Sequence, residues 1–132
     1  MDDNTKMKVD KLYQDRLETL LSVHDLVGEV VTTLQTAGVP NNTYIFYNSD
    51  HGYHLGQFNQ QGEKRQPYEE NIRVLLIVRG PGINPGKKTD RIALNIDITP
   101  TFLDLAGFKL PEDIDGMFLK PVLLNTTNTV IV

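Results

Sequence analysis

Hydrophobic residues recur at spacings near three and four along residues 11–37, which is the period of an amphipathic helix. Charged and polar residues fill the other positions, as they do on the solvent face of a surface helix. Gly38 and Pro40 follow this stretch and supply a helix stop signal. We therefore predict one long helix over residues 11–37.

Two short apolar runs, at residues 43–47 and 72–78, are rich in strand-forming residues. Neither run alternates with polar residues, so we expect both to be strands buried on two faces. Residues 48–70 lie between them and hold glycines, histidines and many polar groups without an apolar period. A polar segment of this length directly after a strand is uncommon unless it is functional. We therefore expect the chemistry to lie in residues 48–70.

The remaining pattern is weaker. Residues 91–96 favour a short strand and residues 100–106 a short helix, capped by Asp97 or Thr99 and ended by Gly107. The tail is expected to be a loop with packing anchors at residues 118–119 and 122–124. The order helix, strand, loop, strand, short strand, helix is typical of an α/β fold, in which ligands bind at the carboxyl ends of strands.

Composition narrows the classes of function. The chain has 132 residues, enough for one domain, and a formal net charge of -4 without a long basic run, which argues against a nucleic-acid partner. No apolar stretch is long enough to span a membrane. The chain has no cysteine, and this excludes disulfides, thiolate ligands and a cysteine nucleophile among these residues.

Asp50 and His51 are adjacent at the expected end of the first strand, and Gly52 follows them. A carboxylate oxygen and an imidazole nitrogen at this position can both reach one divalent cation, while Gly52 allows the backbone to bend away. The same triplet is also common in turns with a solvated acid. Taken alone, it leaves both interpretations open.

His54 and Lys64 are the other candidates in this segment. A lone histidine is more often packed or at the surface than a ligand, and Lys64 with Arg65 is compatible with a solvated charged turn. A lysine is also a compact point charge suited to a sulfuryl or phosphoryl oxygen. Both interpretations of Lys64 stay open at the level of single residues.

Five sequence motifs in a fixed order favour the functional interpretation of these residues over the solvated turn. The run Asn-Ser-Asp-His-Gly-Tyr-His-Leu-Gly-Gln within residues 44–57 is followed by Lys-Arg-Gln-Pro-Tyr-Glu at 64–69. Further blocks lie at residues 72–82, 95–107 and 115–119. Together they resemble the type I sulfatases, and are most similar to the N-acetylglucosamine-6-sulfatases and heparan endosulfatases. The resemblance extends from about residue 11 to about residue 124.

The resemblance implies an alkaline-phosphatase-like α/β fold, of which this chain would hold the C-terminal portion of the mixed sheet with flanking helices. Residues 1–132 would then be a partial sulfatase domain. The family's nucleophile is a formylglycine made from the cysteine of a Cys-x-Pro-Ser-Arg motif, which this sequence lacks. We therefore expect the chain to be inactive alone and to need the missing N-terminal half as a partner.

The resemblance also implies roles for particular residues. Asp50 and His51 match the family's Asp-Asn or Asp-His pair, so they are expected to be ligands of Ca²⁺. Lys64 occupies the place of a lysine that contacts the substrate sulfate. His54 is expected to line the pocket, and we predict that it and Lys64 serve in catalysis and substrate binding.

By this resemblance, the complete enzyme removes 6-sulfate from N-acetylglucosamine residues of glycosaminoglycans such as heparan or keratan sulfate. A lysosomal or extracellular location follows from it, with weak support from the glycosylation sequons at Asn41 and Asn125. The alternative is a catalytically inactive protein that binds sulfated glycans or a partner. A phosphoryl-transfer relative is less favoured, because the three histidines are too few and poorly placed for two transition metals.

Overall fold

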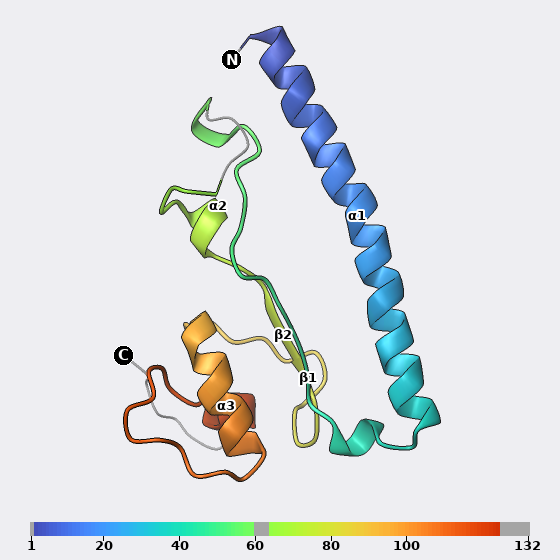
Figure 1. Cartoon of the computed structure of the whole chain (residues 1–132), viewed down its shortest axis with the longest axis vertical. Helices are drawn as coiled ribbons and strands as arrows, with labels where there is room; N and C mark the ends of the chain where they lie inside the picture. Colours follow the sequence, from blue (N-terminus) through green and yellow to red (C-terminus); the bar gives the residue numbers. More distant parts are fainter. Residues whose placement is uncertain (1, 60–63, 125–132) are drawn as a thin grey trace. The chain divides into compact units, whose positions relative to one another are not determined.

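A computed structural model describes residues 2–59 and 64–124 of the chain (Figure 1). The chain divides into two compact units, residues 1–77 and 78–132. In chain order the elements are α1 (Asp3–Thr36), η1 (Pro40–Asn42), β1 (Ile45–Asn48), η2 (Gln57–Asn59), α2 (Glu69–Ile72), β2 (Leu76–Arg79), η3 (Asn95–Asp97), α3 (Ile98–Leu105) and α4 (Lys120–Leu123). Among the described residues, no helix has the length and apolar character needed to cross a bilayer.

The long helix is confirmed, and it begins at Asp3 rather than at residue 11. Asp2 is the N-cap, and its carboxylate accepts a hydrogen bond from the backbone N–H of Thr5 at 2.7 Å. This hydrogen bond lowers the pKa of the Asp2 carboxyl. The helix ends at Thr36, and Gly38 adopts a φ of 71°, which favours glycine. The early start was missed because the first turns are polar and carry no apolar period.

The two expected strands are present, and β1 pairs with β2 in a two-stranded sheet. β2 starts at Leu76 and not at residue 72 as predicted, because Ile72 ends the short helix α2 and residues 73–75 lie in neither a helix nor a strand. The expected burial on two faces is wrong for the described residues. All of β1 is partly buried, and β2 alternates between partly buried and exposed positions.

The second unit is organised around Asp97 and Thr101, which are 5% and 0% exposed. The Asp97 carboxylate accepts hydrogen bonds from the backbone N–H groups of Leu94 and Met117, both at 2.8 Å. The Thr101 hydroxyl donates to the Asp97 carbonyl at 2.6 Å and accepts from the Leu119 N–H at 2.8 Å. These contacts hold the segment after α3 against the start of α3.

Asp97 also explains two corrections. Asp97 or Thr99 was expected to cap the helix. Asp97 occupies the N-cap position, but its side chain makes no capping hydrogen bond to α3 and accepts the N–H of Leu94 instead, while Thr99 lies inside α3. The strand predicted at residues 91–96 is therefore wrong, since the chain turns there into η3. Of the predicted packing anchors, Leu119 is 3% exposed whereas Phe118 is 44% exposed, so only Leu119 serves as a core residue.

Candidate functional site

Backbone hydrogen bonds fix the segment that leaves β1. The N–H of Gly52 donates to the carbonyl of Asn71 at 2.7 Å, and the N–H of Tyr53 donates to the carbonyl of Glu70 at 3.0 Å. A Cβ atom added at Gly52 would lie 1.7 Å from the Glu70 carbonyl oxygen. Gly52 is therefore required because the two backbone segments approach closely, which places Asp50 and His51 next to α2.

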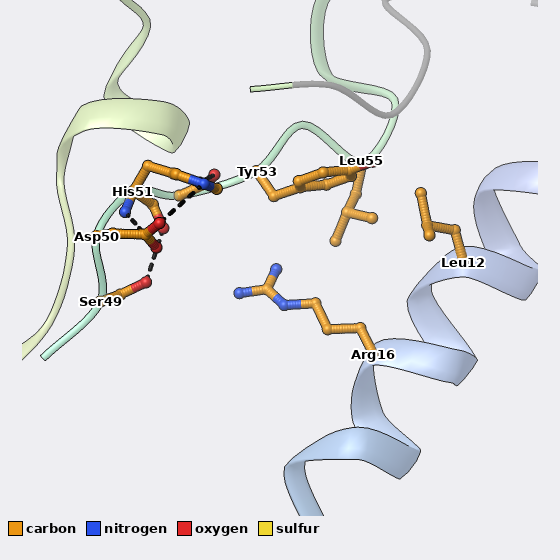
Figure 2. A pocket seen from close by; sticks show the side chains of 8 residues that line it. Leu12, Arg16, Ser49, Asp50, His51, Tyr53 and Leu55 are labelled. Carbon is orange, nitrogen blue, oxygen red and sulfur yellow. Dashed lines mark hydrogen bonds and ion pairs between the residues drawn. The ribbon is translucent and has the colours of Figure 1, made fainter. Parts of the chain in front are cut away.

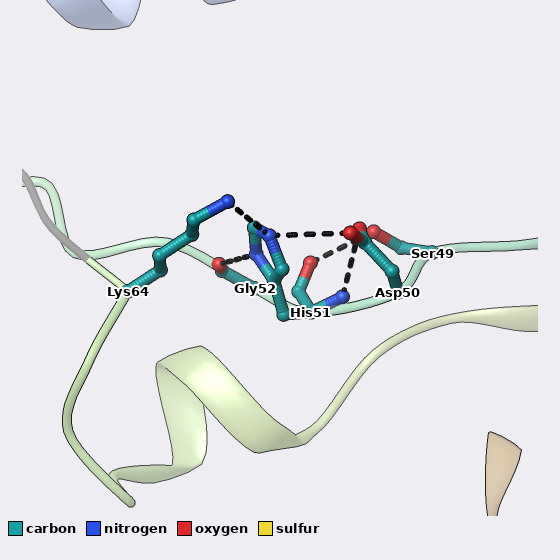
Figure 3. A network of polar contacts seen from close by, with 5 residues as sticks. All are labelled: Ser49, Asp50, His51, Gly52 and Lys64. Carbon is teal, nitrogen blue, oxygen red and sulfur yellow. Dashed lines mark hydrogen bonds and ion pairs between the residues drawn. The ribbon is translucent and has the colours of Figure 1, made fainter.

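Asp50 and His51 point toward one another, as Figure 3 shows. The Oδ2 atom of Asp50 lies 3.3 Å from Nε2 of His51, and the side chain of Asp50 is 84% exposed. Nδ1 of His51 lies 2.7 Å from the Gly52 carbonyl oxygen. Because a carbonyl only accepts, this contact assigns a proton to Nδ1, and Nε2 is the ring nitrogen beside the Asp50 carboxylate.

Lys64 completes the group from the far end of the same segment. Its Nζ atom lies 2.8 Å from Nε2 of His51, where the ammonium donates to the ring lone pair (Figure 3). The structure thus brings Asp50, His51 and Lys64 together. A carboxylate oxygen and an imidazole lone pair that face the same space form a donor set that accepts a cation, and in this structure the Lys64 ammonium fills that role.

This donor set fits two ligands of a divalent metal. The hydrogen bond from Nδ1 of His51 to a backbone carbonyl is the contact that commonly orients a metal-binding histidine. Within residues 2–59 and 64–124 no cluster of three or more histidine, cysteine or acidic residues could hold a metal ion. Any further histidine, cysteine or carboxylate ligand would have to come from outside these residues.

His54 lies beneath the segment, and its side chain has no exposed surface. Its Nε2 atom accepts a hydrogen bond from Nδ2 of Asn71 at 3.1 Å, and its ring contacts the Tyr68 ring edge-on with centroids 5.6 Å apart. Nδ2 of Asn71 also donates to the carbonyl of Gln66 at 2.6 Å. The substrate-contacting position expected for His54 is not the one it occupies here, because α2 and the loop before it cover the ring.

This buried layer is costly. Three of its polar atoms have no hydrogen-bond partner among the described residues: Nδ1 of His54, Oε2 of Glu70 and Oδ1 of Asn71. Each such atom costs about 1–3 kcal/mol. A layer of this kind is difficult to explain by stability alone, because apolar side chains of similar shape would be cheaper.

An open hollow of about 370 Å³ lies between α1 and the loop after β1 (Figure 2). Figure 2 shows the Arg16 side chain extending from α1 toward the loop. The side chains that line the hollow are those of Leu12, Arg16, Ser49, Asp50, His51, Tyr53 and Leu55.

The sequence analysis missed Arg16, Tyr53 and Asn71. A signal for Arg16 was present, because a helix followed at once by a strand reverses the chain and brings the first half of the helix to the carboxyl end of the strand (Figure 1). Nothing in the local pattern marked Asn71 as buried.

Comparisons with known proteins show which family the chain belongs to. The family model described as Sulfatase matches residues 1–108. The chain belongs to the sulfatase family. It is 50% identical over 121 residues to human N-acetylglucosamine-6-sulfatase, a match that covers 91% of this chain and 22% of the relative. It is 45% identical over 119 residues to the extracellular sulfatase SULF-1 homolog of Drosophila melanogaster, covering 90% of this chain and 11% of the relative.

Solved structures give the same result. A protein solved in complex with its substrate, D-glucosamine-2-N,6-O-disulfate, matches with a TM-score of 0.76 and 44% identity, covering 81% of this chain and 22% of that chain. A phosphonate monoester hydrolase from Silicibacter pomeroyi matches with a TM-score of 0.74 and 31% identity, covering 80% and 21%. These neighbours confirm the predicted alkaline-phosphatase-like fold, of which the chain is a part. The chain spans about a fifth of the length of the human relative and of the two solved structures, and about a tenth of the Drosophila relative.

Proposed function

We propose that this chain contributes the sulfate- and metal-binding loop of a sulfuric ester hydrolase that removes 6-sulfate from N-acetylglucosamine residues of glycosaminoglycans. The observation that carries the proposal is the convergence of Asp50, His51 and Lys64. The name of the human relative and the substrate of the solved relative, a glucosamine sulfated at N2 and O6, support the choice of substrate.

Each residue has a role that follows from its chemistry. Asp50 and His51 would hold Ca²⁺, which prefers oxygen ligands and tolerates one imidazole nitrogen. When bound, the metal would supply positive charge next to the sulfuryl oxygens. Lys64 would bind one of those oxygens as a point charge and stabilise negative charge that develops there. The nucleophile would come from the formylglycine-bearing half, since these residues include no cysteine.

His54 is proposed as a positioning residue. Through Asn71 it is connected to the carbonyl of Gln66, which follows Lys64 by two positions. Loss of these hydrogen bonds would release the part of the loop that carries the ammonium, while the Gly52 and Tyr53 backbone contacts would still anchor the Asp50 side.

The partner half is proposed to cover α1. This helix has no buried residue in the structure, and large apolar side chains such as Leu21 and Leu26 are 67% and 58% exposed. Monomers rarely leave so much contiguous apolar surface in water.

Complementation tests the proposed activity. The chain, mixed with calcium and an N-terminal fragment of human N-acetylglucosamine-6-sulfatase that carries formylglycine, should release sulfate from N-acetylglucosamine 6-sulfate. Lys64→Ala should lower the rate by about a hundredfold, as removal of one charge-stabilising donor commonly does. Lys109→Ala, which removes an exposed lysine far along the sequence, is the matched control and should be neutral. A rate equal to that of the N-terminal fragment alone would contradict the proposal.

The metal assignment has its own test. In a calcium titration, Asp50→Ala should bind at least tenfold more weakly than the parent, because removal of a charged ligand costs about 1.4 kcal/mol or more. Equal affinity would remove Asp50 from the ligand set. Asp113→Ala, in an exposed turn, controls for the change in net charge.

The second candidate function is a catalytically inactive protein that binds sulfated glycans. It predicts glycan binding without turnover after complementation, and a loss of that binding in Lys88→Ala, which removes an exposed lysine. The solved phosphonate monoester hydrolase adds a third substrate class. Assays of a phenylphosphonate monoester and of the sulfate ester, run side by side, distinguish a phosphonate hydrolase from a sulfatase. Faster turnover of the phosphonate would contradict the sulfatase proposal.

A lysosomal or extracellular location is also a proposal, and the Drosophila relative is named an extracellular sulfatase. Asn41 is exposed in η1, and the hydroxyl of Thr43 donates to the Val39 carbonyl at 2.8 Å. The other sequon, at Asn125, lies outside the described residues. Expression through a secretory pathway should give a mobility shift on glycosidase treatment, and Asn41→Gln should reduce that shift.

A further inference from the structure

The hollow between α1 and the loop after β1 has two kinds of wall. Leu12, Tyr53 and Leu55 supply apolar surface, and Asp50 with His51 forms the polar end next to Lys64. A site with a few polar groups at one end and an aromatic wall suits a sugar ring, which has apolar faces and polar edges. Arg16 enters this hollow from α1, as Figure 2 shows.

In the part of the chain that the structure describes, no contact of the Arg16 guanidinium explains why the side chain points into the hollow. Among the described residues its guanidinium makes no ion pair or side-chain hydrogen bond, and only its backbone carbonyl is used, by the hydroxyl of Thr19 at 2.8 Å. Acidic neighbours are near in sequence, yet Asp15 pairs with Lys11. The Arg16 guanidinium is therefore available to an anion in the hollow.

We infer that Arg16 binds a second anionic group of the substrate, on the same sugar ring as the 6-sulfate or on the neighbouring residue. This inference rests on the proposed function and deepens it. Lys64 binds the sulfate that is to be removed, and Arg16 binds a further negatively charged group on the other side of the hollow. A guanidinium suits this task, because its planar set of donors matches sulfate or carboxylate oxygens in pairs.

The expected consequence is selectivity. A substrate with only the 6-sulfate uses Lys64 and the apolar wall, whereas a substrate with a second anion uses Arg16 as well. The second anion can be an N-sulfate or the carboxylate of an adjacent uronic acid. The same guanidinium would bind either anion. Probes that carry only one of the two anions show which of them Arg16 binds.

The test is a binding measurement on the full chain with calcium, by ligand-observed NMR. The three probes are N-acetylglucosamine 6-sulfate, glucosamine 2-N,6-O-disulfate, and a uronate-linked N-acetylglucosamine 6-sulfate disaccharide. Arg16→Ala should weaken binding of at least one doubly charged probe by about tenfold, the size of one charge-assisted contact. Binding of N-acetylglucosamine 6-sulfate should change less than about twofold. The doubly charged probe that loses affinity identifies the anion.

Two variants make the outcome decisive. Lys8→Ala removes a positive charge from an exposed position of the same helix outside the hollow, and it should leave the binding of all three probes unchanged. Arg16→Lys keeps the charge and should recover part of the lost affinity. Equal weakening of all three probes by Arg16→Ala, or no weakening, would overturn the inference and leave the proposed function intact. Failure of the parent chain to bind any probe would contradict both.

Discussion

The Nζ atom of Lys64 lies 2.8 Å from Nε2 of His51, although thirteen positions separate the two residues in the sequence. The contact exists because the chain returns after the loop and its backbone pairs at Gly52 with Asn71. The ammonium therefore occupies the lone pair that a metal ion would use. In this arrangement lysine and metal compete for one nitrogen atom of His51.

This competition predicts an opposite effect of Lys64→Ala on two ligands. Calcium affinity should rise by roughly threefold to tenfold, because a positive charge next to an exposed cation site is removed. Affinity for glucosamine 6-sulfate should fall, because the anion loses its point charge. Calcium titration with and without the sugar measures both changes, and Lys64→Arg, which keeps the charge, should not raise calcium affinity. A fall in calcium affinity in Lys64→Ala would show that the lysine supports the metal site instead.

A second prediction concerns the close approach of two backbone segments at Gly52. In Gly52→Ala the new Cβ would lie 1.7 Å from the Glu70 carbonyl oxygen, so the hydrogen bonds of Gly52 and Tyr53 must break. We expect a local loss of roughly 3 kcal/mol, at the upper end of overpacking costs, because backbone atoms cannot move aside. Hydrogen exchange at the Tyr53 amide measures this loss.

Glycine at another position provides the control for that experiment. Gly28 lies within α1, and a Cβ there would meet no atom within 4 Å. Gly28→Ala should therefore stabilise the helix by about 1 kcal/mol, since alanine has the higher helix propensity. Unchanged exchange at Tyr53 in Gly52→Ala would show that the loop can shift without breaking its contacts.

The sequence predicted the parts of the fold that depend on local pattern. Regular spacing of apolar residues predicted α1, and runs of strand formers predicted β1 and β2 to within a few residues. It failed at residues 91–96, where a short strand was predicted. There the Asp97 carboxylate, three residues along the chain, accepts the N–H of Leu94, and a local side-chain hydrogen bond of this kind competes with strand pairing for the backbone donor.

In the candidate site, too, the sequence predicted some features and missed others. The adjacency of Asp50 and His51 was visible in the sequence, and family resemblance pointed to Lys64. Their mutual distances depend on how the loop folds back, which spacing alone does not determine. The burial of His54 was not predicted, because its coverage depends on α2, a helix absent from the pattern.

The third prediction concerns the buried pair His54 and Asn71. Asn71→Ala removes the hydrogen bonds to His54 and to the Gln66 carbonyl, at 3.1 and 2.6 Å. Affinity for glucosamine 6-sulfate should fall by about tenfold, while calcium affinity changes less than about twofold, because Lys64 lies on the released side of the loop. Titrations with the sugar and with calcium give this comparison.

A conservative variant separates positioning from general loosening. His54→Gln can place an acceptor near the position of Nε2, so it should retain more sugar affinity than His54→Leu, which has no acceptor. If calcium and sugar affinities fall equally in Asn71→Ala, the pair supports the whole loop and has no special link to Lys64.

The fourth prediction concerns Asp97 in the second unit. Asp97→Ala would leave the N–H groups of Leu94 and Met117 without their acceptor, at a cost of about 2–4 kcal/mol for two part-buried hydrogen bonds to a charged group. Asp97→Asn keeps one acceptor oxygen, so it should cost less. Hydrogen exchange at the Leu94 and Met117 amides measures the effect within the unit, and the exposed Asp113→Ala should change it by less than about 0.5 kcal/mol. If protection at both amides persists in Asp97→Ala, other contacts hold the segment after α3, and the carboxylate is not what organises this unit.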